Sequence, residues 1–442
     1  MNRVVSADWV LPIEGPPLRD GAVAIEDGRI AAVGPASELG RGTHYDDAVL
    51  LPGFVNAHSH IEYSVYGGFG DGLGDFAEWI SLHVERKARI GWEEYVDIAR
   101  LGAAQCLASG VTTIGDCSYS GAAAVACAEL GLRATIYLEV FGADPAPALE
   151  SFAERRERVQ PSFSERIRPG ISPHAPYSVS LELYRAAAEL GLPVATHISE
   201  SPSEVAYLTT GEGPWGAYTD LLVTPAGTTG TRMLAAHGLL GPAVVAAHCV
   251  MVDAEEMGLL AETRTGVAHC PRSNGALGCG VAPLTELREA GVQVGVGTDS
   301  PASSPSFDFF EELRSVLFSA RARAQRPDVL SAATVLELGT LGSARAIGLD
   351  DELGSLAPGK RADLSVVSLE GSAYLPVEDP AAAVVYGGTP ERVLAAFVDG
   401  EPRYERGGME WHELTAAAHS ARRAMLAVPP AAEAAPVAAP RA

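Results

Sequence analysis

The stretch Pro52-Gly53-Phe54-Val55-Asn56-Ala57-His58-Ser59-His60 decides the fold. It is a short apolar run, typical of a buried strand, and it ends on two histidines separated by one residue. Residues i and i+2 of a strand point to the same side, and the twist at a strand end can direct both imidazoles at one ion. Alone, a His-x-His pair is more typical of a polar surface, so its meaning depends on the rest of the chain.

Seven further short apolar runs each reach an ionisable residue at or just after their C-terminal end. These residues are Asp116, Glu139, His174, His197, His248, His269 and Asp299. Segments with apolar residues at three-to-four spacing, such as 92–109 and 181–190, separate the runs and predict helices. Eight strands with crossover helices predict a (β/α)₈ barrel of the TIM type, whose active site lies at the C-terminal strand ends. An open doubly wound sheet would also alternate, but it does not explain the polar residues at so many run ends.

The two chain ends predict a second, smaller unit. Residues 21–34 contain an Asp27-Gly28 turn between segments rich in strand-forming residues, a pattern that predicts a hairpin. Similar strand-like segments occur at 362–368 and 393–400. We therefore expect a small β-sandwich domain built from both chain ends. The expected division is 1–49 for its N-terminal part, 50–350 for the metal-dependent barrel, 351–405 for its C-terminal part, and 406–442 for a helix and a flexible Ala/Pro-rich tail.

The charge balance excludes several classes of partner. Among 442 residues, 56 acidic and 32 basic side chains give a net charge of −24, which repels phosphate backbones and anionic lipids. Nucleic acid is therefore not an expected partner. No stretch approaches about 18 consecutive apolar residues and no secretion signal is visible, so no membrane span is expected. Six cysteines without a Cys-x-x-Cys pair are typical of reduced thiols, and the expected location is cytoplasmic.

The strand-end histidines and aspartate can form a metal site. His197, His248 and Asp299 end runs equivalent to the one that carries His58 and His60. Three imidazoles and one carboxylate from this set suit Zn²⁺ or Fe²⁺ and leave one position open for water.

Motifs along the chain resemble the amidohydrolase superfamily. The first stretch quoted above looks like its first-strand signature, and residues 354–364 resemble its return into the small β domain. Four motifs resemble its cytosine, guanine and adenosine-derivative deaminase branch: His197-Ile198-Ser199-Glu200, Ala247-His248-Cys249, His269-Cys270-Pro271-Arg272-Ser273-Asn274 and Gly297-Thr298-Asp299-Ser300. The resemblance covers about residues 1–405.

The resemblance implies one divalent metal ion per chain, with Zn²⁺ expected first and Fe²⁺ as the alternative. Binuclear members use a carboxylated lysine near the third or fourth strand, and this chain has no lysine between Lys87 and Lys360. By position in the motifs, the implied metal ligands are His58, His60, His197 and Asp299.

Three residues receive catalytic roles. Asp299 can touch both the metal and the attacking water, so it is the expected general base. Glu200 matches the family residue that moves a proton from the water to the ring nitrogen and then to the leaving amine. His248 matches the histidine that orients or polarises the water. The competing interpretations are a structural turn for Asp299, a solvated loop acid for Glu200 and a fourth metal ligand for His248.

Two residues are expected to contact the substrate besides Glu200. His174, in Ser172-Pro173-His174-Ala175-Pro176-Tyr177, resembles a loop histidine that contacts the substrate in adenosine-derivative deaminases; packing at a strand end is the alternative. Glu62 can face the pocket and read a ring edge, or it can form a structural salt bridge. Phe76 and Trp79 are expected in the core.

We therefore expect a metal-dependent hydrolytic deaminase that removes the 6-amino group of an adenine nucleoside derivative and releases ammonia. The stretch around His174 looks most like enzymes acting on 5′-modified adenosines, such as aminodeoxyfutalosine, methylthioadenosine and S-adenosylhomocysteine. One departure is Ser303-Ser304-Pro305, where many methylthioadenosine-type enzymes have an asparagine pair. The alternatives are a guanine, 8-oxoguanine or pterin deaminase and a cyclic amide or triazine hydrolase. Similar proteins are commonly homo-oligomers.

Overall fold

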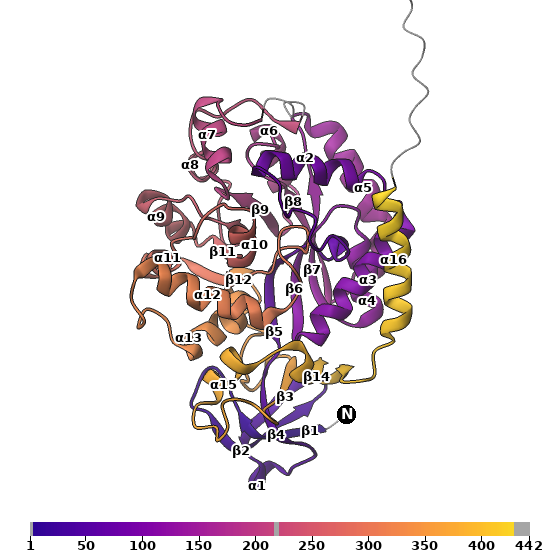
Figure 1. Cartoon of the computed structure of the whole chain (residues 1–442), viewed down its shortest axis with the longest axis vertical. Coiled ribbons are helices and arrows are strands. Elements are labelled where there is room, and N and C mark those ends of the chain that lie inside the picture. The colour runs from indigo at the N-terminus through magenta and orange to yellow at the C-terminus, as the bar shows by residue number, and fades with distance from the viewer. Residues whose placement is uncertain (1–2, 216–220, 428–442) are drawn as a thin grey trace, which may run out of the picture.

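The computed structural model describes residues 3–215 and 221–427 and contains two sheets. One is an eight-stranded parallel sheet ringed by helices, and the other is a seven-stranded mixed sheet at one end of the molecule (Figure 1). The chain enters the mixed sheet first, builds the whole parallel sheet, and then returns to the mixed sheet. The predicted Ala/Pro-rich tail, from residue 428 on, lies outside the described residues.

The parallel sheet is the predicted TIM-type barrel. Its strands follow one another in chain order from β5 to β12, and all eight apolar runs of the sequence supply them. The strands are β5 (Phe54–Ser59), β6 (Val111–Ser118), β7 (Arg133–Val140), β8 (Ile167–Pro173), β9 (Val194–Ile198), β10 (Val244–His248), β11 (Gly266–His269) and β12 (Gln293–Val296).

One bridge closes the barrel between its last and first strands. Ser59 pairs with Asp299, and the Asp299 N–H donates to the His58 carbonyl oxygen at 3.0 Å. The closing bond thus joins the backbones of two predicted metal ligands, which fixes their side chains at the same edge of the barrel.

The first run of the sequence divides between the two sheets. Residues up to Pro52 belong to β4 (Thr43–Pro52) of the mixed sheet, and the barrel strand begins only at Phe54. Gly53 lies at the crossing, where a Cβ would come within 2.0 Å of Thr112 Oγ1. Only glycine therefore lets the chain pass this close to β6.

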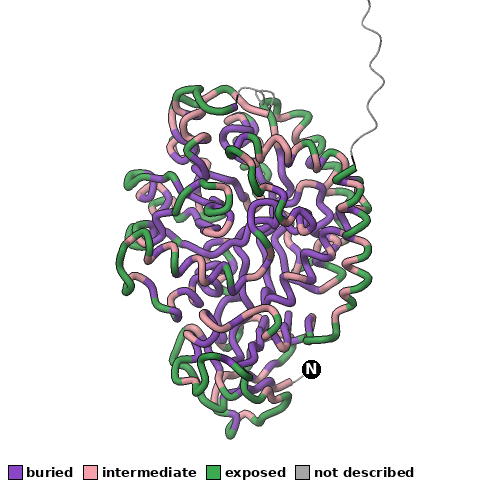
Figure 2. The backbone as a smooth tube through the Cα atoms, viewed as in Figure 1, coloured by how far each residue is buried: buried purple, intermediate pink, exposed green. Residues whose placement is uncertain are grey.

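Helices cover the outside of the barrel, so its strands are buried on both faces (Figure 2). The helices predicted over 92–109 and 181–190 are α3 (Trp92–Ala108) and α6 (Leu181–Ala188). The others around the barrel are α2 (Phe76–Lys87), α4 (Ala122–Leu130), α5 (Pro145–Val159), α7 (Pro202–Thr210), α8 (Gly230–Ala236), α9 (Ala254–Thr263), α10 (Pro271–Ala276), α11 (Leu284–Glu289), α12 (Phe309–Ala324), α13 (Ala332–Glu337) and α14 (Ser343–Ala346).

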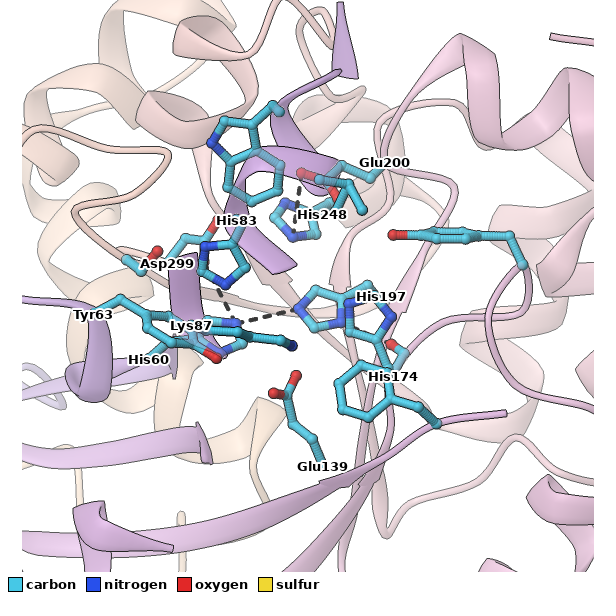
Figure 3. Close-up of a pocket in the computed structure, with 15 residues that line it drawn as sticks. His60, Tyr63, His83, Lys87, Glu139, His174, His197, Glu200, His248 and Asp299 are labelled. Atoms are coloured by element: carbon cyan, nitrogen blue, oxygen red, sulfur yellow. Dashed lines mark hydrogen bonds and ion pairs between the residues drawn. The ribbon is translucent and has the colours of Figure 1, made fainter. Parts of the chain in front are cut away.

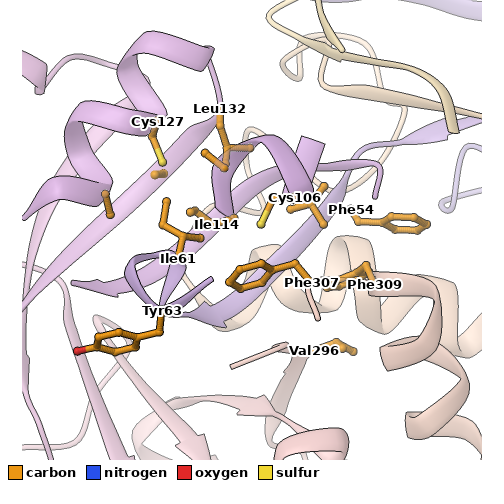
Figure 4. Packing of buried hydrophobic residues seen from close by; sticks show 14 of the residues in the cluster. Phe54, Ile61, Tyr63, Cys106, Ile114, Cys127, Leu132, Val296, Phe307 and Phe309 are labelled. Carbon is orange, nitrogen blue, oxygen red and sulfur yellow. The ribbon is translucent and has the colours of Figure 1, made fainter. Parts of the chain in front are cut away.

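The main core lies between the barrel strands and these helices. Phe54 stacks on Phe309 with ring centroids 5.1 Å apart, and Ile114 and Leu132 pack in the same cluster (Figure 4). Inside the barrel the cluster is small, and Tyr137 is its one large side chain among alanines, a valine and a cysteine. The barrel is therefore a packed core whose functional space is at its rim.

The mixed sheet is the predicted small β domain from both chain ends. It is one continuous sheet because β4 pairs with β1 on one side and with β13 on the other, which links strands of the two ends. In spatial order its other strands are β15 (Glu401–Glu405), β14 (Val393–Val398) and β13 (Leu364–Ser368) on one side of β4, and β1 (Arg3–Val10), β2 (Leu18–Glu26) and β3 (Arg29–Pro35) on the other. The short helix α1 (Ala36–Leu39) packs against β2 and β3, whereas α15 (Pro380–Gly387) packs against α12 and α13 of the barrel.

The helix expected over 410–426 is α16 (Trp411–Leu426), which lies against α3 (Figure 1). The exact domain limits stay predictions. All six cysteines are buried and free, as expected for reduced thiols. Within 3–215 and 221–427, no helix combines the length and apolarity needed to cross a membrane.

Arg133 joins the barrel to the mixed sheet, so its removal is expected to destabilise the fold. Its guanidinium contacts Asp363 Oδ2 at 2.8 Å and Asp399 Oδ1 at 2.5 Å, and its side chain is 5% exposed. Arg133→Ala leaves these two carboxylates without their buried partner. We expect a loss of about 3–5 kcal/mol in the free energy of unfolding, measured by urea denaturation. Arg326→Ala, which removes an exposed pair with Asp328, is the control and should leave the midpoint unchanged; equal midpoints for both variants would contradict the prediction.

Candidate metal centre and active site

A pocket opens at the C-terminal ends of the barrel strands (Figure 3). The structure brings most of the predicted site residues to its wall. They are His60, His174, His197, Glu200, His248 and Asp299. His58 lies beneath them, in ring contact with His60, His197 and His248.

The four predicted metal ligands converge on one point. His60 Nε2 lies 3.3 Å from His197 Nε2, and Asp299 Oδ1 lies 3.6 Å from His60 Nε2 and 3.7 Å from His58 Nε2. Two groups share His58: His58, His60 and His197, and His58, His248 and Asp299, each with its ligand atoms within 4.8 Å of one another.

The donor set fits a divalent metal ion. His58 Nε2 is buried and has no hydrogen-bond partner among the described residues. His197 Nδ1 donates to the His174 carbonyl at 2.7 Å, so its Nε2 carries the free lone pair. Burial and then the neighbouring imidazoles lower the pKa of His197 to about 3, which keeps it in the neutral form that binds metals. Three neutral imidazoles and a carboxylate form a ligand set typical of Zn²⁺ or Fe²⁺.

The Asp299 carboxylate is oriented by two serines. Its Oδ2 accepts hydrogen bonds from Ser273 Oγ at 2.7 Å and from Ser303 Oγ at 2.6 Å, while Oδ1 faces the histidines. Burial alone would raise the pKa of Asp299, but His60, His58 and His248, together with the Ser303 hydrogen bond, hold it well below its usual range. Asp299 is therefore an ionised carboxylate.

Backbone strain is concentrated at these strand ends. Ser199, His248, Cys249 and Asp299 have φ of 51°, 73°, 47° and 56°, in the left-handed region that non-glycine residues rarely adopt. Such strain costs about 1–3 kcal/mol per residue and persists where the surrounding structure imposes it, commonly at functional sites.

Glu200 lies on the loop after β9 and faces His248. Its Oε1 is 3.7 Å from His248 Nε2. The backbone N–H groups of Ser199 and Glu200 each donate to the Glu204 carboxylate at 2.8 Å, which holds this loop in place. Burial, followed by the charge of Asp299, raises the pKa of Glu200 well above its usual value. A buried carboxyl with a raised pKa can hold a proton and deliver it.

His248 is positioned by Asn274. His248 Nδ1 lies 2.9 Å from Asn274 Oδ1 and donates to it, which leaves Nε2 facing Glu200 and the metal ligands.

Asn274→Leu is expected to lower kcat about 10–100-fold, because the His248 ring loses the partner that fixes its orientation and tautomer. Metal content, measured by elemental analysis, should stay at the wild-type level because Asn274 contacts none of the four predicted ligands. Asn274→Asp keeps an acceptor and should recover part of the activity. Equal losses in both variants would show that the hydrogen bond to His248 is not what matters.

His174 and Trp79 lie at the pocket wall. His174 Nδ1 contacts Ser178 Oγ at 2.7 Å, and its ring lies 4.8 Å from that of His197. Trp79, expected in the core, lines the pocket and is held by a hydrogen bond from its Nε1 to Ala302 O at 2.9 Å. Phe76 is buried as expected.

Glu62 does not line the pocket. Its carboxylate accepts hydrogen bonds from Ser118 Oγ and from the backbone N–H groups of Ser120, just before α4, and of Ala123, in its first turn. The predicted contact of Glu62 with a substrate ring is therefore not supported, because both carboxylate oxygens already bind the chain. His269, whose role the sequence left open, is buried outside the pocket lining.

Among the pocket residues that were not predicted from the sequence are Tyr63, His83, Lys87 and Glu139. A signal for two of them existed, because Trp79, His83 and Lys87 are spaced i, i+4, i+8 and share one face of α2. Glu139 follows the same strand-end pattern as the metal ligands.

The family model that matches the chain is that of the amidohydrolase family, over residues 49–403, and the chain belongs to this family. A model of an imidazolonepropionase-like composite domain of bacteria also matches residues 21–41. The fold and the His/Asp cluster described above are thus those of a hydrolase acting on C–N bonds, built for a divalent metal ion.

Similar proteins include several nucleoside deaminases. A 5-methylthioadenosine/S-adenosylhomocysteine deaminase of Moorella thermoacetica is 33% identical over 92% of this chain and 95% of its own length. A 5′-deoxyadenosine deaminase of Methanothermobacter thermautotrophicus is 32% identical over 89% of this chain and 91% of its own. The crystal structure of an adenosine deaminase from Xanthomonas campestris with bound zinc superposes with a TM-score of 0.85 at 29% identity, covering 96% of this chain and 98% of that one.

Proposed function

We propose that this protein hydrolyses the 6-amino group of an adenine nucleoside derivative and releases ammonia. The observation that carries the proposal is the placement of Glu200, a buried carboxyl of raised pKa, beside His248 and facing the His/Asp cluster. Hydrolysis of an aromatic amine needs such a proton carrier, because attack on the ring carbon places negative charge on the adjacent ring nitrogen. The names of the similar proteins favour adenosine derivatives.

The metal ion would be held by His58, His60, His197 and Asp299. A divalent ion there supplies Lewis-acid activation of water. We propose zinc, which the similar Xanthomonas campestris structure contains, with iron as the alternative. We propose one ion per chain, because His197 has a single free nitrogen and it faces His60.

The chain's own residues then move the protons. Ionised Asp299 accepts a proton from the attacking water, and His248 orients that water through its Nε2. Glu200 delivers its own proton to the ring nitrogen beside the reacting carbon. It then takes up the remaining proton of the added hydroxyl as the 6-oxo group forms and passes it to the leaving amine. The proton held by Asp299 returns to Glu200, so both carboxyls end in the state in which they began. A C–O bond forms at the ring carbon, the C–N bond breaks, and the products are the 6-oxo nucleoside and ammonia.

The test is ammonia release by metal-replete protein from a panel of aminated rings. The panel holds aminodeoxyfutalosine, methylthioadenosine, S-adenosylhomocysteine, 5′-deoxyadenosine, adenosine, guanine, 8-oxoguanine and a pterin. We expect turnover of nucleosides only. Turnover of a free base without ammonia release from any nucleoside would overturn the proposed substrate class. No ammonia release from any compound of the panel would point to hydrolysis of a cyclic amide instead.

A further inference from the structure

Two oppositely charged side chains on the pocket wall have no role in the mechanism above. Lys87 ends α2 and is 9% exposed, and Glu139 lies near the end of β7 and is 2% exposed. Both line the pocket, and in Figure 3 Glu139 lies on the side of the imidazoles away from Glu200. Lys87 is one of only two lysines in the chain.

The Lys87 ammonium has aromatic neighbours but no acceptor. Its Nζ lies 4.2 Å from the ring centroid of Tyr119 and 4.7 Å from that of Phe141. No hydrogen bond or ion pair joins it to another side chain in the described ranges, and Glu139 lies beyond ion-pair distance. Its three N–H donors are therefore left for a molecule in the pocket.

The Glu139 carboxylate likewise accepts no hydrogen bond from the part of the chain that the structure describes. A carboxylate oxygen of Glu139 lies within 4.8 Å of ring nitrogens of His174 and His197, an arrangement that can suggest a second metal. Two observations oppose this. His197 already uses one nitrogen on the His174 carbonyl and turns the other toward His60. Lys87 lines the same wall of the pocket, and a positive charge there disfavours a second cation.

Buried charges without hydrogen-bond partners are costly, so this wall is built for a ligand group that satisfies both. A simple anion suits Lys87 but is repelled by Glu139. A hydroxyl group donates to a carboxylate and accepts from an ammonium, so a pair of hydroxyls satisfies both side chains at once.

We propose that Lys87 and Glu139 form a subsite for the sugar hydroxyls of the substrate. Glu139 accepts hydrogen bonds from the hydroxyls, and Lys87 donates to their oxygens. The inference rests on the proposed function and narrows it, because it requires a nucleoside with intact 2′- and 3′-hydroxyls and disfavours free bases. Lys87 and Glu139 are then the specificity-determining residues of this pocket.

The experiment compares the wild type and each variant on two substrates, adenosine and 2′,3′-dideoxyadenosine. The measured quantity is kcat/KM. For the wild type, loss of both hydroxyls should lower kcat/KM about 10–100-fold, the range for hydrogen bonds to charged groups. Glu139→Leu and Lys87→Met should lower kcat/KM for adenosine by a similar factor. Both variants should change the value for the dideoxy substrate by less than about threefold, which also shows that they fold.

Two control variants carry matched substitutions outside the pocket. Lys360→Met changes the other lysine, which lies near Glu14 in the small domain, and Glu189→Leu changes an exposed acid. Both should behave as the wild type with each substrate.

Other outcomes would overturn the inference. If Glu139→Leu and Lys87→Met lower kcat/KM equally for both substrates, the pair is structural, and the proposed function stands. If Lys87→Met impairs S-adenosylhomocysteine but spares methylthioadenosine, Lys87 binds a carboxylate and not hydroxyls. If the wild type releases ammonia from no nucleoside, the proposed function itself fails and this inference with it.

Discussion

Replacement of Glu200 by glutamine is expected to lower kcat about 10²–10⁴-fold while the metal stays bound. The amide keeps the shape of the side chain and its place beside His248, but it can carry no proton between the water, the ring and the amine. Because Glu200 is not among the four converging ligand residues, elemental analysis should find wild-type metal content in the variant. Steady-state ammonia release measures the loss in kcat.

The control for this variant is Glu189→Gln, the same change at an exposed position on the far end of α6, which should leave kcat unchanged. Near-wild-type turnover by Glu200→Gln would refute the proton-transfer role. A lower metal content in the same variant would mean that Glu200 supports the metal rather than the substrate.

His197→Ala is expected to lose metal and activity together. His197 Nε2 faces His60 Nε2 at 3.3 Å, and its other nitrogen is tied to the chain by the His174 carbonyl, so the substitution removes one oriented donor from the four-residue ligand set. Loss of a residue that only orients a ligand typically lowers metal affinity or activity about 10–100-fold. Loss of a direct ligand should lower both by more than this. Metal content after dialysis and ammonia release on the same preparation give the two readings.

His419→Ala on α16 is the matched control, because His419 is exposed and remote from the pocket. It should keep both metal and turnover. A His197→Ala protein with full metal content and no activity would contradict the assignment of His197 as a ligand and would instead place it with the orienting residues.

The barrel could be predicted from the sequence because each of its strands is an apolar run that ends on a polar residue. The division of the first run could not be predicted. Residues 50–52 are as apolar as the strand that follows, and only the close approach of Gly53 to Thr112 shows where the chain changes sheets. Likewise, the single continuous mixed sheet depends on β4 pairing on both sides, which no local pattern records.

Some residues of the site could be predicted from the sequence and others could not. Residues at strand ends, such as His58, His197 and Asp299, were predictable because a parallel barrel brings all its C-terminal ends to one rim. For Lys87 the spacing shows only that it shares a face of α2 with Trp79 and His83. Whether that face is turned toward the pocket depends on the packing of α2, which the sequence does not show. Glu62 was misplaced because its sequence neighbours point to the pocket while its own carboxylate binds the backbone at the start of α4.

The most direct test of the central claim is the fate of oxygen from water. Metal-replete protein is given methylthioadenosine, or another nucleoside that it turns over, in water labelled with heavy oxygen, and the product is analysed by mass spectrometry. Hydrolytic deamination predicts one labelled oxygen on the ring carbon that held the amino group, with one ammonia released per labelled product. A product that keeps the amino group on its ring carbon would contradict the account. So would a product that has lost this group with release of ammonia but carries no labelled oxygen.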